Sequence, residues 1–556
     1  MRAPSVLTIL AAAMLLILVG VPVLFILAQA VFPDFARGSF AGAFSSLEML
    51  TQNDRLLRQA QNTLLLALAV MLGCLIFGLP IGILRGLFRV PGARVWDILF
   101  LIPFLIPPFI AAIAWMMTLQ PRGYLQQIVG FDLGRFLFSF TGVAFVMTLN
   151  LFPVVYFAVS RSLQMVGGRF SMAARVHGAG PLQAFFLITL PLSVPAIAAS
   201  LLIVFAMSIE EFGTPAALAA RTGFEVLVTG IYTRLSDWPI DLSGAATGSV
   251  MLMAMVLAAF ALQNWVATRR SFVSQTGKPA DLNQAELGAW RWPVLGLFML
   301  VALIGVIIPL LAIAATSLTG TISGGLAWAN LDTRHYGPLF SQGSKAAQAL
   351  MTSSGLAVLT ALISAMLGGL VAHIVVRGQG RSRTFMDGLS VLPNAIPAIV
   401  LAVGIILAWN SPFLPVTLYG TTAILLVAYV GILLPYPIRY AVARLREISE
   451  TLDDAARVAG ASQAQSLRHI TLPLMAPSLI ASMMLVFAIA SRELVASIML
   501  APAGLRTVGT YVFSQFEQGS VQTGMAMSVI AITITSGILL AANLWLPRIG
   551  NSALSG

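Results

Sequence analysis

Long apolar runs without charge constrain this chain more than any other feature. Residues 6–30 and 64–84 contain no Asp, Glu, Lys or Arg. A helix of about 20 apolar residues is long enough to cross the hydrocarbon of a bilayer. Only 9% of the 556 residues are charged, whereas soluble domains carry about 25%. The sequence therefore predicts an integral membrane protein and excludes a soluble globular one.

Counting these runs predicts about twelve transmembrane segments. All should be helices, because a backbone in lipid must satisfy its own hydrogen bonds. Their expected limits are 6–31, 60–84, 96–118, 138–160, 191–212, 243–267, 293–317, 350–376, 385–409, 420–442, 474–500 and 521–546. The first run is longer than the apolar part of a secretory signal peptide, so we expect it to be a retained span. The predicted fold class is an all-α integral membrane protein.

The distribution of cations predicts the orientation. If the N-terminus lies in the cytoplasm, most of the 31 Lys and Arg residues fall in cytoplasmic connectors, which places both termini inside. The net charge of +11 does not indicate a nucleic-acid partner, because the cations lie in short connectors without interleaved aromatic residues. The single cysteine, Cys74, lies within a span and excludes an intrachain disulfide.

Two polar segments repeat each other. The first, AARVHGAGPLQAFFLITLPLSVP, covers residues 173–195, and the second, AARVAGASQAQSLRHITLPLMAP, covers residues 455–477. Without a gap, Gly178 matches Gly460 and Glu211 matches Glu493. Such agreement at a fixed offset is typical of an internal duplication.

The duplication predicts the domain organisation. The polar stretch 268–292 is interpreted as a cytoplasmic linker between a first half, 1–267, and a second half, 293–556, with six spans each. An even number of spans gives both halves the same orientation. We therefore expect a parallel repeat about an axis along the membrane normal.

Each repeated loop has the pattern of a helix, a break and a second helix. In the second loop, Ser449 and Thr451 are candidate N-caps, and acids follow near the helix start, where they favour the helix dipole. Gly460 is placed to end the helix in a left-handed conformation. The pattern predicts a short helix along the membrane surface that makes a mechanical contact. The alternative is a connector that only covers helix ends.

The pattern E-A-A-x3-G-x9-I-x-L-P resembles the cytoplasmic signature of permease subunits of binding-protein-dependent ABC importers, and it occurs twice here. The resemblance implies the type I ABC importer permease fold, in which this loop is a coupling helix that docks on a separate ATPase subunit. The implied coupling residues are Met172, Ala173, Ala174, Gly178, Asp454, Ala455, Ala456 and Gly460. The acidic position is Asp454 in the second loop but Met172 in the first, so we expect the two ATPase contacts to be unequal.

The resemblance also implies the partners. These are two copies of an ABC ATPase, a periplasmic solute-binding protein, and the lipid bilayer of a bacterial inner membrane. The chain contains no G-x4-G-K-[ST] loop, since its single Gly-Lys pair is followed by proline. ATP and Mg are therefore expected on the partner ATPase. No catalytic residue and no cofactor is predicted in this chain.

The substrate is predicted from a narrower resemblance. Two copies fused in one chain, with EEFGTPAAL at 210–218 and SRELVASIML at 491–500, resemble ferric-iron permeases. Thiamine and phosphonate permeases share the fused layout. Ferric iron is the expected cargo, and a phosphonate, a sugar phosphate or thiamine is the alternative. A different class, an ion-gradient-driven secondary transporter, would favour buried acids at mid-span.

Ionisable residues and prolines near span ends give candidates for a gate or transport path. Glu210, Glu211, Arg492 and Glu493 fall at the expected outer ends of spans 191–212 and 474–500. Pro107 and Pro397 recur within spans 96–118 and 385–409, where proline kinks a helix. The alternatives are ordinary charges at helix ends and simple packing kinks. The histidines show no ligand spacing, so no metal site is predicted.

Overall fold

The chain is helical throughout the residues that can be described. The computed structural model describes residues 6–45, 54–166, 174, 176–219, 222–269, 284–378, 381–414, 417–449 and 451–552. Within these ranges the β-structure consists of two isolated bridges, Phe88 with Ala285 and Thr319 with Leu331. The predicted all-α fold class is confirmed.

Nine helices of the described chain are long and apolar enough to cross a membrane. They are Leu7–Val31, Asp54–Leu87, Phe140–Gln164, Leu182–Ile209, Leu242–Val266, Gly288–Leu318, Lys345–Arg377, Leu467–Ala490 and Val521–Ile538. Two bent pairs also qualify, Ala93–Leu105 with Pro108–Val129 and Thr422–Leu433 with Pro435–Glu447, and Ala398–Trp409 is a shorter apolar helix. Each predicted span therefore overlaps one of these helices or bent pairs.

The helices pack into two compact units. One comprises Met1–Gln52, Ile231–Met253 and Arg334–Gly556, and the other comprises Asn53–Gly230 and Ala254–Thr333. These units are defined by contacts between residues, whereas the predicted halves 1–267 and 293–556 are defined by the sequence repeat. The division into halves stays a prediction.

The unit around Asn53–Gly230 is built from the helices of the first repeat and from the helix that follows the linker. Its helices are α4 (Asp54–Leu87), α5 (Ala93–Leu105), α6 (Pro108–Leu119), α7 (Tyr124–Val129), α8 (Gly134–Leu137), α9 (Phe140–Val166), α11 (Pro181–Ala184), η3 (Phe185–Thr189), α12 (Leu190–Ile209), α13 (Gly213–Leu218), η5 (Gly288–Trp290), α16 (Arg291–Ala302), η6 (Leu303–Ile307), α17 (Ile308–Leu318) and η7 (Trp328–Asn330). Helices α14 (Leu227–Ser236) and α15 (Leu242–Arg269) each contribute residues to both units.

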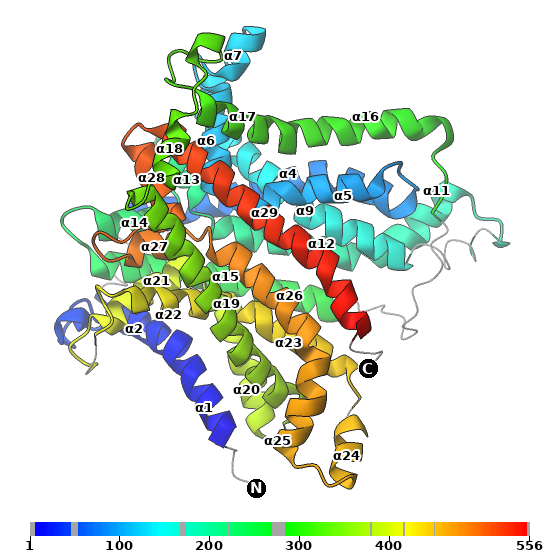
Figure 1. The fold of residues 1–556 in the computed structure, drawn as a ribbon, viewed down its shortest axis with the longest axis vertical. Coiled ribbons are helices and arrows are strands. Elements are labelled where there is room, and N and C mark those ends of the chain that lie inside the picture. The colour runs from blue at the N-terminus through cyan, green and yellow to red at the C-terminus, as the bar shows by residue number, and fades with distance from the viewer. Residues whose placement is uncertain are drawn as a thin grey trace. The chain divides into compact units, whose positions relative to one another are not determined.

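The other unit holds the N-terminal helix and the second repeat. Its helices are α1 (Val6–Leu15), η1 (Leu16–Gly20), α2 (Val21–Val31), η2 (Phe35–Arg37), η8 (Arg334–Tyr336), α18 (Gly337–Phe340), α19 (Lys345–Arg377), α20 (Arg381–Val391), η9 (Leu392–Ala395), α21 (Ala398–Trp409), α22 (Thr422–Leu433), α23 (Pro435–Glu447), α24 (Thr451–Val458), α25 (Gln463–Ser466), η10 (Leu467–Thr471), α26 (Leu472–Ala490), α27 (Val495–Leu500), α28 (Val508–Glu517) and α29 (Val521–Ser552). Within it, α19 packs along α23 and α26 (Figure 1).

Three glycines on α4 allow it to lie directly against α9. A Cβ added at Gly78 would lie 2.9 Å from the carbonyl oxygen of Phe152, and one added at Gly86 would lie 2.7 Å from the Cβ of Leu163. Between them, a Cβ at Gly82 would lie 3.0 Å from the Cβ of Val159. Small residues at a spacing of four let the backbones of transmembrane helices approach closely. Such close packing stabilises the helix pair in lipid, where the hydrophobic effect does not drive association.

The helix after the linker packs against the helices of the first repeat. The ring of Phe298 on α16 lies 5.7 Å from those of Trp96 and Phe100 on α5, and Phe100 contacts Tyr156 of α9 at 5.0 Å. In the other unit, the N-terminal helix α2 packs on α21 of the second repeat. Each unit therefore contains the first span of the other sequence half.

Two predicted spans are broken at a proline that follows an extended residue. Span 96–118 divides at Ile106 and Pro107, and the helices on either side meet at 97°. Span 385–409 divides at Ile396 and Pro397. In both, the residue before proline is extended, with ψ of 125° at Ile106 and 115° at Ile396, because the proline ring disfavours a helical conformation there.

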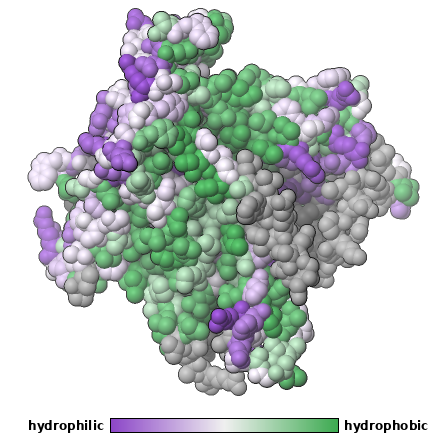
Figure 2. All heavy atoms as spheres, in the orientation of Figure 1, coloured by the Kyte–Doolittle hydropathy of each residue, from purple (hydrophilic) through white to green (hydrophobic). Residues whose placement is uncertain are grey.

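Apolar side chains on the outer faces of the long helices have the pattern of a lipid contact. On α19, Met351, Val358, Leu359, Leu362 and Met366 form an exposed stripe, and Met351 and Met366 are each 75% exposed. These positions lie on one helical face. Figure 2 shows hydrophobic side chains gathered over much of the surface in view, as expected of helices in a bilayer.

Candidate functional site

The second repeated loop contains the short helix α24, and Gly460 ends it. The N–H of Gly460 donates to the carbonyl of Arg457 at 3.0 Å, and the N–H of Ala461 donates to that of Ala456 at 2.9 Å. This pair of bonds is a Schellman cap. Gly460 has φ of +87°, a conformation that favours glycine because it has no Cβ.

The first repeated loop ends its helical turn in the same way. The N–H of Ala179 donates to the carbonyl of Ala174 at 3.0 Å, and Gly178 has φ of +88°. These residues stand at the positions of Ala461, Ala456 and Gly460 in the repeat. Met172 and Ala173, predicted to belong to this contact, lie outside the described residues. The two loops thus share one backbone geometry at their glycines.

Each loop exposes a valine at the same position of the repeat. Val176 is 85% exposed and Val458 is 90% exposed, and in the second loop Asp454 and Ala455 are exposed as well. A single exposed valine is ordinary, but here the exposure recurs at the same position of both copies. The sequence alignment pairs these valines, yet only the fold reveals their exposure.

Asp453, next to the predicted contact residue Asp454, faces other helices of its own chain. Its Oδ1 accepts hydrogen bonds from the Ser466 hydroxyl at 2.6 Å and the Thr471 hydroxyl at 3.1 Å. Its Oδ2 lies 3.5 Å from Nε of Arg377, at the end of α19. Sequence reasoning placed Asp453 only as an acid near a helix start. Its partners are distant in sequence, so no local signal could have identified it.

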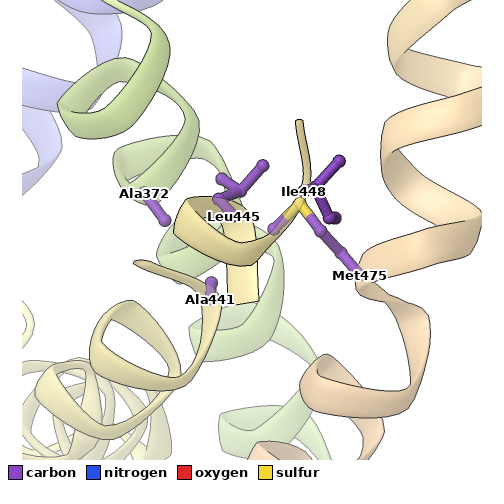
Figure 3. Close-up of a cluster of buried hydrophobic side chains, with 5 residues drawn as sticks. All are labelled: Ala372, Ala441, Leu445, Ile448 and Met475. Atoms are coloured by element: carbon purple, nitrogen blue, oxygen red, sulfur yellow. The ribbon is translucent and has the colours of Figure 1, made fainter. Parts of the chain in front are cut away.

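A buried apolar cluster holds the segment that enters this loop. The cluster consists of Ala372 of α19, Ala441 and Leu445 of α23, Ile448 directly after α23, and Met475 of α26. Figure 3 shows the side chains of Leu445, Ile448 and Met475 converging between the helices. Ile448 immediately precedes the loop, so the loop leaves the helix bundle from a fixed point.

Two of the predicted gate residues are helix-capping carboxylates. Glu211 accepts hydrogen bonds from the N–H groups of Gly213 at 2.7 Å and Thr214 at 3.2 Å, at the start of α13. Glu493 does the same for Ala496 at 2.9 Å and Ser497 at 3.0 Å, at the start of α27. A carboxylate at a helix start satisfies unpaired donors and favours the dipole. This geometry supplies a structural role for both acids.

The neighbouring charges lie at the ends of the preceding helices. Glu210 ends α12, and its own N–H donates to Ala206 at 3.3 Å. Arg492 follows the end of α26, where its N–H donates to Ile489 at 3.3 Å. Both side chains are partly exposed. Their assignment to a gate or path stays a prediction.

In each repeat, the helix that the glutamate caps contacts the helix that follows the proline break. The hydroxyl of Thr214 on α13 donates to the carbonyl of Pro108 at 3.5 Å, directly after Pro107. In the other unit, α27 packs on α21, which starts directly after Pro397. In each unit, a broken helix is thus supported by a short capped helix.

A continuous helix leads from each repeated loop to the helix-capping glutamate of that repeat, Glu211 or Glu493. The span Leu182–Ile209 has 28 residues, which is about 40 Å at 1.5 Å per residue. Gly178 precedes it and Glu211 follows it. The span Leu467–Ala490 connects Gly460 and Glu493 in the same order. In each repeat, one membrane-length helix therefore separates the loop from its glutamate.

Comparison with known proteins decides which family has this architecture. The sequence profile of the binding-protein-dependent transport system inner membrane component matches residues 78–272 and again residues 364–549. These two matches cover more than half of the chain and fall on the two repeats. The chain belongs to this family.

Some relatives of this permease align with most of its length, and others align with about a third of it. It is 27% identical over 495 residues to a ferric transport system permease protein of Actinobacillus pleuropneumoniae, covering 87% of this chain and 70% of that protein. It is 28% identical over 474 residues to a putative ferric transport system permease protein of Haemophilus influenzae, covering 84% and 73%. A molybdenum transport system permease protein of Escherichia coli is 29% identical over 210 residues, 36% of this chain and 91% of that protein.

The family assignment confirms the resemblance read from the loops. The permease is a multi-pass membrane component of a transport system with the type I ABC permease fold. Within the described residues, no group of three or more His, Cys, Asp or Glu side chains is arranged to hold a metal ion.

Proposed function

We propose that this permease is the membrane channel of an ATP-driven importer. It takes a solute from a periplasmic binding protein and passes it to the cytoplasm by alternating access. Two copies of an ABC ATPase bind ATP and Mg and dock on the two coupling loops. Both termini of the permease lie in the cytoplasm, on the same side as these loops.

The observation that carries this proposal is the shared geometry of the two loops. Both end at a glycine in the left-handed region and expose a valine at one repeat position. Duplicated surfaces suit a partner that binds twice. Helices of about 40 Å lead from the loops to α13 and α27, which contact the helices that start after Pro107 and Pro397. Closure of the ATPase would displace these helix breaks.

Ferric iron is the proposed cargo. Two double-length relatives carry ferric transport in their names, and each aligns with more than four fifths of this chain. Relatives named for 2-aminoethylphosphonate align over only 34% of it. A phosphonate, a sugar phosphate or thiamine is the alternative cargo for the same machinery.

Reconstitution in liposomes tests mechanism and cargo separately. The permease, its ATPase and its binding protein are assembled with ATP supplied on the ATPase side, and uptake of radioactive iron is measured. Iron uptake that requires both partners and ATP is the expected result. Uptake of another solute would change the cargo alone. Uptake without ATPase that stops when the ion gradient is dissipated would replace the importer with a secondary transporter.

The unequal loops give a prediction about assembly. Replacing Asp454 with alanine removes an exposed negative charge from the second loop, and we expect it to reduce co-purification of the ATPase. Met172→Ala removes no charge and should reduce co-purification less. Quantitative pull-down of the ATPase on the tagged permease measures both. Equal losses would contradict the predicted inequality of the two contacts.

A further inference from the structure

Asp453 joins three elements at the base of the second coupling loop. It lies on α24, accepts hydrogen bonds from Ser466 and Thr471 on one oxygen, and pairs with Arg377 of α19 through the other. We propose that Asp453 is a positioning residue that fixes α24 to α19 and α26 and transmits force from this loop. The proposal deepens the proposed function and rests on it.

Burial makes the ion pair of this network more than a surface contact. The side chains of Asp453 and Arg377 are 15% and 11% exposed, so water screens their attraction less than it does for an exposed pair. Arg377 also donates from Nη2 to the carbonyl of Ile448 at 2.7 Å. One guanidinium therefore contacts both the acid in α24 and the segment that enters the loop.

The two hydroxyl contacts lie at the ends of a π-helix. Ser466 directly precedes η10 and Thr471 is its last residue. Both donate to the same carboxylate oxygen of Asp453. A π-helical turn inserted in an α-helix is often found at functional sites. Here the carboxylate couples α24 to both ends of this turn, and α26 continues directly from it.

The first repeat has the same π-helix without the same polar partners. Phe185–Thr189 is π-helical, but the hydroxyl of Thr189 donates to the carbonyl of Ala184 at 3.4 Å, within its own helix. Ala184 stands where the second repeat has Ser466, and Ser171, outside the described residues, stands where it has Asp453. Serine cannot form an ion pair. A carboxylate that can pair with an arginine therefore stands at this repeat position in the second loop and not in the first.

The test separates anchoring from folding and from ATPase binding. Asp453→Ala, Asp453→Asn and the double variant Ser466→Ala with Thr471→Val are each reconstituted with the ATPase and the binding protein. Solute transported per ATP hydrolysed is measured in assembled complexes. Thr189→Val is the matched control in the first loop. Glu447→Gln is the acidic control, because Glu447 forms an exposed pair with Arg444, and such pairs contribute little.

We expect Asp453→Ala to bind ATPase and to hydrolyse ATP, while transport per ATP falls about tenfold. The double hydroxyl variant should lose coupling as well, and Asp453→Asn, which keeps an oxygen acceptor, should lose less than Asp453→Ala. Both controls should retain the ratio of the unmodified complex.

Two outcomes would overturn the proposal. One is an unchanged transport-to-ATP ratio in Asp453→Ala and in the double hydroxyl variant. The other is a loss of assembled complex in Asp453→Ala and Asp453→Asn with a normal ratio in what remains, because a purely structural residue would behave in this way. Failure of the unmodified complex to transport with ATP would instead count against the proposed function.

Discussion

Replacing Gly460 with valine is expected to uncouple ATP hydrolysis from transport. Gly460 has φ of +87°, and a β-branched residue in the left-handed region costs about 2 kcal/mol. Because 1.4 kcal/mol corresponds to tenfold, the loop would leave the Schellman geometry in a large share of molecules. The exposed face of α24 would then be misplaced against the ATPase. We expect transport by the reconstituted complex to fall about tenfold.

Gly504 provides a matched control for this experiment. It has φ of +86°, and a Cβ added there would meet no atom within 4 Å, as at Gly460. Gly504→Val therefore carries the same backbone cost at a site outside the coupling loop. Gly460→Asn should retain most transport, since asparagine tolerates this conformation. Equal loss in Gly504→Val and Gly460→Val, or normal coupling in Gly460→Val, would contradict a role of the Gly460 cap in coupling.

Replacing Gly82 with leucine is expected to prevent stable folding of the unit that contains α4 and α9. A Cβ at this position would already lie 3.0 Å from the Cβ of Val159 and 3.1 Å from the carbonyl oxygen of Tyr156. Leucine adds three further carbons in the same place. Overpacking costs about 1–3 kcal/mol or more, and α4 and α9 associate through close backbone contact. Monodisperse protein after detergent extraction should fall about tenfold.

The same substitution on an open helix face separates this clash from the chemistry of leucine. Gly355 lies in the middle of α19, and a Cβ there would meet nothing within 4 Å. Gly355→Leu should give a yield close to that of the unmodified permease. Size-exclusion chromatography of both variants measures the difference. Normal yield from Gly82→Leu would show that α4 and α9 do not pack as described.

Local sequence signals predicted the spans and the ends of the loops. Apolar length alone identifies α4 and α19, because crossing lipid requires it. Gly460 was predicted as a helix-ending residue from its place after a polar helix, and both it and its repeat partner Gly178 have positive φ. These features depend on residues close together in sequence.

Features that depend on tertiary contacts could not be predicted. Pro107 indicated a kink but not its size, which is 97°. After the bend α6 packs against α13, and no residue near Pro107 in the sequence encodes that contact. Asp453 and Asp454 are chemically identical neighbours. One faces Arg377 and the other is exposed only because α24 packs in one orientation against α25 and η10. The glutamates at 211 and 493 resembled gate residues, and their backbone partners appear only in the fold.

Cysteine crosslinking tests the central claim most directly. The single native cysteine, Cys74, is buried, so cysteines placed at Val176 and Val458 supply the accessible thiols. Trp238, which is 90% exposed and is expected on the outer side, serves as the control position. Val176→Cys and Val458→Cys should each crosslink to the ATPase and resist a membrane-impermeant maleimide in intact cells, whereas Trp238→Cys should do neither. Labelling of either valine position from outside, or no crosslink from both, would contradict the account.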